Sequence, residues 1–292
     1  MSITAQAARA AADQYREEGF AIVRQFVDGD DLTRLRAETA RMYDEGMTHP
    51  TTFRHGNLCF EILPERDFGR RYVIQAYWMS WISDYFEHFR RSGDTFTLLE
   101  PFLGRDIKQI AQQIHWKPPG AGLTGYRWHQ DLRFRPKREE FREIEASSVT
   151  IGLAVDPSTR ENGCLQVIPR SHRMGYLGLS DDGDGQIMKG VSSDDQLRAA
   201  GLDPADVVWL ELEPGDLAIW GLMTVHGSLP NTSDQDRAFA LSSYVRADTT
   251  DRGEWAFRDG VSTPIGTTPA MCKYEALRER PEPHYVDQKW YA

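Results

Sequence analysis

The chain has 292 residues, 27% of them charged, and a net charge of −10 at neutral pH. This length allows one large domain with additions or two domains, and the acidic balance argues against a general nucleic-acid surface. The sequence contains no apolar run of about 18 residues and no charged start followed by an apolar stretch, so it predicts neither a transmembrane helix nor a secretory signal.

The N-terminal part is expected to be helical. The alanine-rich stretch 5–18 is followed by Gly19, a residue typical of helix C-termini. A short strand is predicted over residues 19–23. Aspartates in 28–31 favour the start of a second helix that runs to about Glu45, because acidic side chains stabilise the positive end of a helix dipole.

Residues 53–91 are unusually aromatic, with interleaved arginines. The aromatic residues are Phe53, Phe60, Phe68, Tyr72, Tyr77, Trp78, Trp81, Tyr85, Phe86 and Phe89, and the arginines are Arg54, Arg66, Arg70, Arg71, Arg90 and Arg91. One interpretation is a helical or loop subdomain that packs its aromatics into a secondary core and leaves its arginines in solvent. The other is a lid over a ligand site, whose aromatics hold an apolar ring system and whose arginines bind an anion.

From about residue 105 to 247 the sequence predicts many short strands separated by Gly, Pro and Asp turns. The stretch 107–116 alternates weakly, and 148–155 is a nearly continuous apolar run suited to a buried strand. The other predicted strands are 165–168, 207–212, 217–220 and 238–245. This pattern favours a sandwich or jelly roll over a parallel α/β sheet. No repeat or low-complexity linker interrupts the chain, so residues 1–292 are predicted to form a single domain.

A histidine and a carboxylate stand two positions apart, at His129 and Asp131, and His226 follows far downstream. On an extended strand, residues i and i+2 point to the same side, so His129 and Asp131 can reach one ion. Two imidazoles and one carboxylate on one face of a metal leave the opposite face open, as in non-heme Fe(II) oxygenases. The two histidines are 97 positions apart (226 − 129). Only a closed all-β wrap of the kind predicted above would bring them together.

Arg237 stands eleven residues after His226, at the head of a predicted strand. A buried arginine needs an anion, and its planar fork suits a carboxylate. Ser228, two residues past His226, adds a hydroxyl on the same side of the chain. With a metal, these groups describe a slot for a short dicarboxylate. The alternative for Arg237 is a salt bridge to a nearby Asp or Glu.

Several motifs occur in a recognisable order. They are KPPG at 117–120, WHQD at 128–131, ENGCLQVIPRSH at 161–172 and PGD at 214–216, followed by His226, NTS at 231–233 and Arg237. With these motifs the chain resembles the phytanoyl-CoA dioxygenase family of Fe(II)/2-oxoglutarate oxygenases. The resemblance implies a mainly β fold, a double-stranded β-helix (jelly roll, cupin-like) with buttressing N-terminal helices.

The resemblance also implies roles for the site residues. His129, Asp131 and His226 would be the iron ligands, and Ser228 and Arg237 would hold the 2-oxoglutarate carboxylate remote from the metal. The implied reaction uses O₂, releases succinate and CO₂, and hydroxylates an unactivated C–H bond. The intact Asp131 favours hydroxylation over halogenation, whereas desaturation, epoxidation or ring formation would use the same ligands. A non-catalytic metal-binding jelly-roll protein is the less favoured alternative.

Other residues near these motifs leave alternatives open. Gln113 and His115 share parity with Lys117 on the strand that enters the site, so they either line the co-substrate slot or pack in the core. Two positions depart from the family pattern. Gly152 stands where some members carry a tryptophan near the co-substrate, and Arg170 stands where the family often has glycine.

The sequence leaves the substrate and the oligomeric state open and suggests only a chemical class. Lys117 and the arginines at 127, 133 and 135 surround the first ligands with positive charge. Together with the aromatic segment 53–91, they suggest a small-molecule substrate that is partly apolar and anionic. The widely spaced cysteines Cys59, Cys164 and Cys272 lack paired metal spacing, which favours a reducing, cytoplasmic location.

Overall fold

The computed structural model describes residues 3–119, 124–135, 138–180, 193–266 and 280–286. Gly120 of the KPPG motif and Cys272 lie outside the described residues, and so does the side chain of Arg66. Within the described part, no helix is both long and apolar enough to cross a membrane. Cys59 and Cys164 are buried free thiols.

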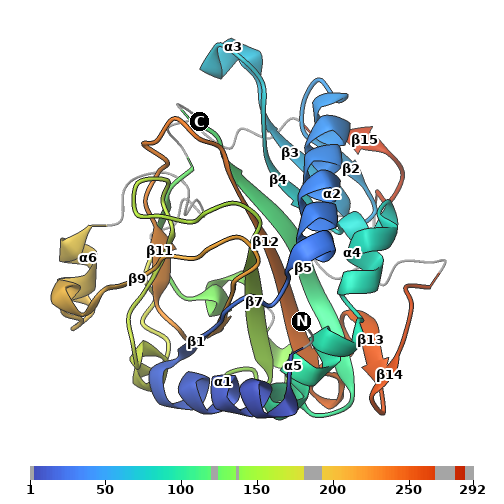
Figure 1. The fold of residues 1–292 in the computed structure, drawn as a ribbon. Coiled ribbons are helices and arrows are strands. Elements are labelled where there is room, and N and C mark those ends of the chain that lie inside the picture. Colours follow the sequence, from blue (N-terminus) through green and yellow to red (C-terminus); the bar gives the residue numbers. More distant parts are fainter. Residues whose placement is uncertain (1–2, 120–123, 136–137, 181–192, 267–279, 287–292) are drawn as a thin grey trace.

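The strands of the described chain pair antiparallel, and the longer helices come from its N-terminal third (Figure 1). The helices are α1 (Ala5–Glu18), α2 (Gly29–Met47), α3 (Glu65–Phe68), α4 (Asp84–Phe89), α5 (Gly93–Leu103) and α6 (Asp194–Ala199). The strands are β1 (Phe20–Val23), β2 (Phe53–His55), β3 (Leu58–Leu63), β4 (Tyr72–Tyr77), β5 (Ile107–Lys117), β6 (Tyr126–His129), β7 (Ser148–Ala154), β8 (Leu165–Val167), β9 (Val208–Leu210), β10 (Leu217–Gly221), β11 (His226–Ser228), β12 (Arg237–Arg246), β13 (Glu254–Arg258), β14 (Val261–Ser262) and β15 (His284–Tyr285).

The strands form two sheets. The larger follows the order β1-β10-β7-β12-β5-β4-β3-β2-β15, with β13 and β14 branching from β5, and the smaller follows the order β6-β11-β8-β9. Trp220 and Phe239 of the large sheet pack in one buried cluster with Leu165, Val167 and Leu210 of the small sheet. The sheets therefore face each other, and the strands β5 to β12 form the jelly roll that the sequence predicted.

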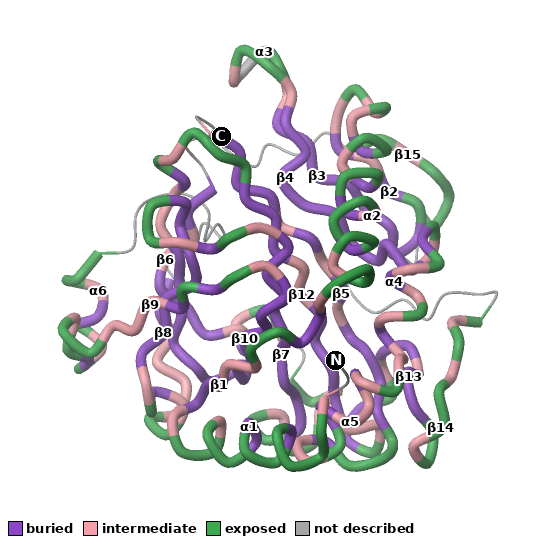
Figure 2. The backbone as a smooth tube through the Cα atoms, viewed as in Figure 1, coloured by how far each residue is buried: buried purple, intermediate pink, exposed green. Residues whose placement is uncertain are grey.

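The N-terminal helices cover the outer face of the large sheet (Figure 2). The α1 bounds agree with the predicted 5–18, and Gly19 ends the helix with φ 82° while its N–H donates to the Tyr15 carbonyl. Leu35 of α2 and Leu98 of α5 are fully buried in the cluster that contains Ile114 of β5. Burial of these apolar side chains holds the buttressing helices on the sheet.

The prediction that residues 53–91 form a helical or loop subdomain is wrong for most of the segment. Strands β2, β3 and β4 extend the large sheet beyond β5, and only short helical turns follow them. Every residue of β3 and β4 is buried, and α2 contacts β4. Strands buried on both faces lose the alternation of polar and apolar residues, which is why the pattern did not reveal them.

The arginines of this segment have local partners. Arg90 is fully buried and donates to Gln109 Oε1 at 2.8 Å and to the Trp255 carbonyl at 2.6 Å. Arg91 pairs with Glu87, with 2.6 Å between Nη2 and Oε2. These contacts give Arg90 and Arg91 structural roles, and the burial of Arg90 contradicts the expectation that the arginines of the packed segment lie in solvent. The anion-binding lid stays a prediction, and Arg90 and Arg91 do not support it.

Candidate metal centre and co-substrate slot

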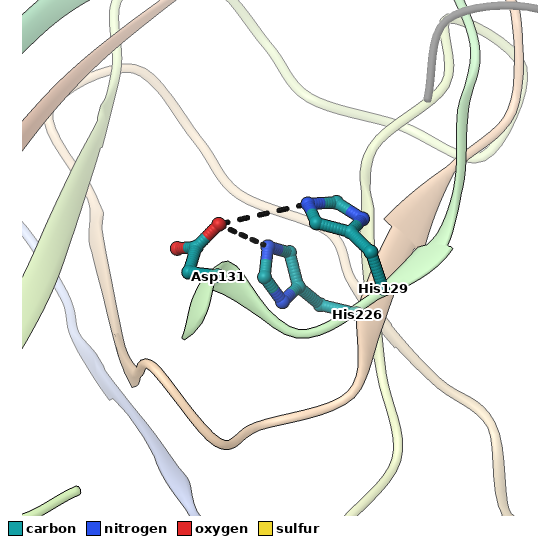
Figure 3. Close-up of side chains that lie close together, drawn as sticks. All are labelled: His129, Asp131 and His226. Carbon is teal, nitrogen blue, oxygen red and sulfur yellow. Dashed lines mark ion pairs between the residues drawn. The ribbon is translucent and has the colours of Figure 1, made fainter. Parts of the chain in front are cut away.

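Three predicted ligands come together between the sheets (Figure 3). Asp131 Oδ1 lies 3.6 Å from His129 Nε2 and 3.5 Å from His226 Nε2. His129 and His226 are opposite each other in antiparallel β6 and β11, and their ring centroids are 4.1 Å apart. Among the described residues, this is the group of three His, Cys, Asp or Glu side chains whose ligand atoms all lie within 4.8 Å of one another. One ion can therefore contact all three atoms.

The backbone reaches this geometry differently from the expected continuous strand. Strand β6 ends at His129, and Asp131 begins a 3₁₀ turn, so the strand prediction for Asp131 was wrong. Gln130 nevertheless keeps an extended conformation (φ −118°, ψ 133°), which leaves His129 and Asp131 on the same side. The Gln130 amide points away from them and donates to the carbonyls of Gly175 and Met223.

Backbone carbonyls set the tautomer of both histidines. His129 Nδ1 lies 2.7 Å from the Arg127 carbonyl, and His226 Nδ1 lies 2.8 Å from the Thr224 carbonyl. A carbonyl only accepts hydrogen bonds, so each Nδ1 carries the proton and each Nε2 presents its lone pair to the site. Hydrogen bonds of this kind orient metal-ligating histidines.

Burial and mutual charge shift the pKa of each group in the cluster. Burial would raise the pKa of Asp131, but the adjacent His226 and His129 outweigh it and hold that pKa well below its usual value. Burial and then the charge of His226 lower the pKa of His129. Burial would lower the pKa of His226, but the adjacent Asp131 carboxylate outweighs it and raises that pKa above its usual value. The ionised Asp131 carboxylate and the neutral His129 imidazole are forms that bind a metal, and a metal would displace a proton from His226.

A second set of buried polar groups lies between the sheets. Lys117 of β5 and Arg237 of β12 are opposite each other in the strand register, and both are almost completely buried. Lys117 Nζ donates to Ser228 Oγ at 2.6 Å, to the Leu229 carbonyl at 2.5 Å and to the Gly163 carbonyl at 3.1 Å. Arg237 Nη2 donates to the same Gly163 carbonyl at 3.2 Å.

Arg237 fits a carboxylate that would come from outside the chain. Its Nε is buried and has no hydrogen-bond partner among the described residues. The alternative of a salt bridge is not found within the described chain, where no Asp or Glu pairs with the guanidinium. Burial lowers the pKa of Arg237 to about 10, so the side chain remains charged at neutral pH. A buried cation with an orphaned donor is the feature that a dicarboxylate would satisfy.

Lys117 is the slot residue that the sequence arguments missed. They counted it as one of several positive charges near the first ligands and as the residue whose parity Gln113 and His115 share, but not as a residue that contacts the co-substrate. The useful signal was its period-two spacing from Gln113 and His115, which places all three side chains on one face of β5. Burial, followed by the charge of Arg237, lowers the pKa of Lys117 well below its usual value.

Gln113 and His115 do lie on the face of β5 that looks toward the small sheet. Both are partly exposed, whereas Gln112 and Ile114 on the opposite face are buried. His115 Nε2 and Gln113 Oε1 are 2.8 Å apart, and the His115 ring stacks on Tyr126. The structure therefore places Gln113 on the same face of β5 as Lys117, and its contact with the co-substrate stays a prediction.

The two departures from the family pattern have structural explanations. Arg170 has φ 62°, a left-handed conformation that glycine adopts more readily, and its N–H donates to the Glu18 carbonyl at 2.7 Å. Gly152 lies in β7 beneath the rings of Phe239 and Trp220. A tryptophan at Gly152 would need the space that these two rings fill.

The chain is similar in sequence to known dioxygenases. It matches the family model described as phytanoyl-CoA dioxygenase (PhyH) over residues 15–239. The probable alpha-ketoglutarate-dependent hypophosphite dioxygenase of Stutzerimonas stutzeri is 30% identical over 158 residues, 54% of this chain and 52% of that protein. The methylphosphonate hydroxylase of Gimesia maris is 33% identical over 142 residues, 49% of this chain and 46% of that protein. The chain thus spans about half the length of these curated relatives.

The fold is also found in solved structures. The epimerase SnoN in complex with Fe³⁺, alpha ketoglutarate and nogalamycin RO aligns with a TM-score of 0.60 at 19% identity, covering 92% of this chain and 94% of that one. This likeness confirms the predicted jelly roll. The family match covers most of the chain, including the metal cluster and Arg237, and it confirms the expected class of Fe(II)/2-oxoglutarate dioxygenases. The chain therefore belongs to the phytanoyl-CoA dioxygenase family.

Proposed function

We propose that this chain is an Fe(II)- and 2-oxoglutarate-dependent oxygenase that hydroxylates an unactivated C–H bond of a small-molecule metabolite and releases succinate and CO₂. One observation carries the proposal. The three converging ligand atoms of His129, Asp131 and His226 lie in the same interior as the buried Arg237, whose Nε lacks a partner in the described chain. A metal at the cluster and a dicarboxylate that reaches Arg237 would use both features.

Each residue has a distinct task in this proposal. His129, Asp131 and His226 hold iron on one face and leave the opposite face open. The bound metal and co-substrate supply the oxidative chemistry. Arg237 and Lys117 attract the remote carboxylate of 2-oxoglutarate, and the Ser228 hydroxyl adds a hydrogen bond there. Because these groups are buried, they exclude water and act in a low-dielectric environment where charge pairing is strong.

The proposed substrate is small, partly apolar and anionic. Arg127 precedes the first ligand on β6, and Arg133 lies in the 3₁₀ turn that starts at Asp131. Both arginines are partly buried beside the metal cluster, where they would raise the local positive potential. Two relatives are named for hypophosphite and methylphosphonate, which are small anions. These observations support an anion without identifying it.

The test is co-substrate turnover, followed by a substrate screen. The purified protein should convert 2-oxoglutarate to succinate only with added Fe(II) and O₂, and a panel of anionic, neutral and cationic metabolites should then be compared for stimulated succinate release. A product that gains one oxygen atom identifies hydroxylation or epoxidation, which the presence of a new exchangeable hydroxyl hydrogen separates, whereas loss of two hydrogens identifies desaturation or ring formation. No Fe(II)-dependent succinate under any condition would contradict the proposal and favour a non-catalytic binding protein. Stimulation by cations alone would contradict only the anionic substrate class.

A further inference from the structure

Gly152 of β7 lies between two aromatic rings on the inner face of the large sheet. A methyl group at this position would lie 2.5 Å from Phe239 Cε1 and 2.8 Å from Trp220 Cζ3. Both distances are far shorter than a van der Waals contact between carbon atoms, about 3.5–4.0 Å. Glycine is required here for space, because any side chain would displace at least one ring.

The first ring, Trp220 of β10, orients the predicted carboxylate ligand. Its side chain is 1% exposed, and its Nε1 donates to Asp131 Oδ2 at 3.1 Å. The other oxygen of the same carboxylate, Oδ1, faces both histidines. The indole N–H therefore distinguishes the two oxygens of Asp131, occupying one and leaving the other for the site.

The second ring, Phe239 of β12, supports the predicted anchor for the co-substrate. Phe239 and Arg237 are two residues apart on one strand and so lie on the same face. The guanidinium carbon of Arg237 is 5.1 Å from the centroid of the Phe239 ring, within the range of a cation–π contact. The Phe239 ring can pack directly against the backbone of Gly152 because glycine has no side chain. In that position, the Arg237 guanidinium lies over the Phe239 ring.

We infer that Gly152, Trp220 and Phe239 form one positioning unit that orients two different side chains. Trp220 positions Asp131 for the metal, and Phe239 positions Arg237 for the co-substrate carboxylate. Neither ring needs to touch the reacting atoms, so both are positioning residues. The inference rests on the proposed function, since it takes Asp131 as a ligand of iron and Arg237 as the anchor of 2-oxoglutarate.

The experiment is a crossed pair of variants with two binding measurements, made by anaerobic calorimetric titration. Trp220→Phe keeps an aromatic side chain in β10 and removes the N–H donor together with the outer indole ring that lies over Gly152. It should weaken Fe(II) binding about 10- to 100-fold, the usual effect of losing a partner of a metal ligand, and leave 2-oxoglutarate affinity at saturating Fe(II) unchanged. Phe239→Leu should weaken 2-oxoglutarate on the order of 2- to 30-fold and leave Fe(II) affinity unchanged.

A matched control removes an indole elsewhere. Trp116→Phe changes a buried tryptophan in the helix-facing core, where its ring contacts Tyr43, and it should alter neither affinity. Parallel losses of both affinities in each variant, or an unchanged Fe(II) affinity in Trp220→Phe, would overturn the inference. Failure of the unmodified protein to bind Fe(II) or 2-oxoglutarate would instead refute the proposed function, so the two failures are distinguishable.

Discussion

Replacing Arg237 with leucine should weaken 2-oxoglutarate binding strongly without unfolding the protein. The guanidinium is 3% exposed, makes one hydrogen bond at 3.2 Å to the Gly163 carbonyl, and keeps a buried Nε without a partner in the described chain. Leucine removes a desolvated charge that no carboxylate of the described residues pairs with. The fold therefore loses little, and the co-substrate loses its anchor.

The magnitude follows from the bonds that are lost. A hydrogen bond to a charged group contributes about 1.5–3 kcal/mol, which corresponds to a rise of roughly 10–150-fold in the dissociation constant. Binding should not be abolished, because Lys117 keeps its contact with Ser228. The charge of Arg237 also depresses the pKa of Lys117, so its removal favours the charged form of the lysine. Arg237→Lys should lose less, since it keeps the charge but not the planar fork.

Calorimetric titration of 2-oxoglutarate into anaerobic, Fe(II)-saturated protein measures this effect directly. Arg160→Leu is the matched control, because Arg160 lies three residues before Gly163 but is 64% exposed and pairs with Glu211. The control should bind 2-oxoglutarate normally. An unchanged dissociation constant in Arg237→Leu would refute the placement of the slot and move the anchor elsewhere.

Three further predictions concern the metal and the second cation. His129→Ala and His226→Ala should each abolish Fe(II)-dependent succinate release while thermal unfolding shows an intact fold; most activity remaining in either variant would remove the iron assignment. Fe(II) at 100 times its dissociation constant should raise the free energy of unfolding by about 2.7 kcal/mol. That gain should be absent in His226→Ala, and an equal gain there would place the metal elsewhere. Lys117→Met should weaken 2-oxoglutarate binding and also lower the melting temperature, because the Leu229 carbonyl and the Ser228 hydroxyl lose their Nζ donor; tighter or unchanged 2-oxoglutarate binding would contradict its role in the slot.

The metal cluster was accessible to sequence reasoning because its chemistry narrows the choices. The sequence combines a histidine and an aspartate two positions apart with a distant second histidine and an arginine at the head of a strand. Ordinary core packing or surface exposure rarely accounts for all four residues, whereas a metal site with a bound carboxylate does. The backbone conformation between His129 and Asp131 was harder to predict. Strand β6 stops at His129, and the extended backbone of Gln130 alone keeps His129 and Asp131 on one side. The prediction that the two side chains share one side was therefore right, although the predicted strand does not continue to Asp131.

Long-range packing accounts for what the sequence arguments missed. Strands β3 and β4 are buried on both faces between a helix and the sheet interior, so their residues show no alternation to read. The contact of Trp220 with Asp131 joins positions 89 residues apart. No local pattern predicts such a contact, because it depends on where β10 lies in the sheet and on the absence of a side chain at Gly152.

The register of the two sheets places the metal cluster and the proposed co-substrate slot in one interior. His129 pairs with His226 across β6 and β11 in the small sheet, and Lys117 pairs with Arg237 across β5 and β12 in the large sheet. Ser228 is the only one of the slot residues on the same strand as a metal ligand, and it receives a hydrogen bond from Lys117 of the facing sheet. That bond links the two sheets at the strand position where Lys117 pairs with Arg237. Under the proposed function these polar groups would receive the carboxylate, while the apolar cluster that contains Trp220 and Phe239 holds the sheets together.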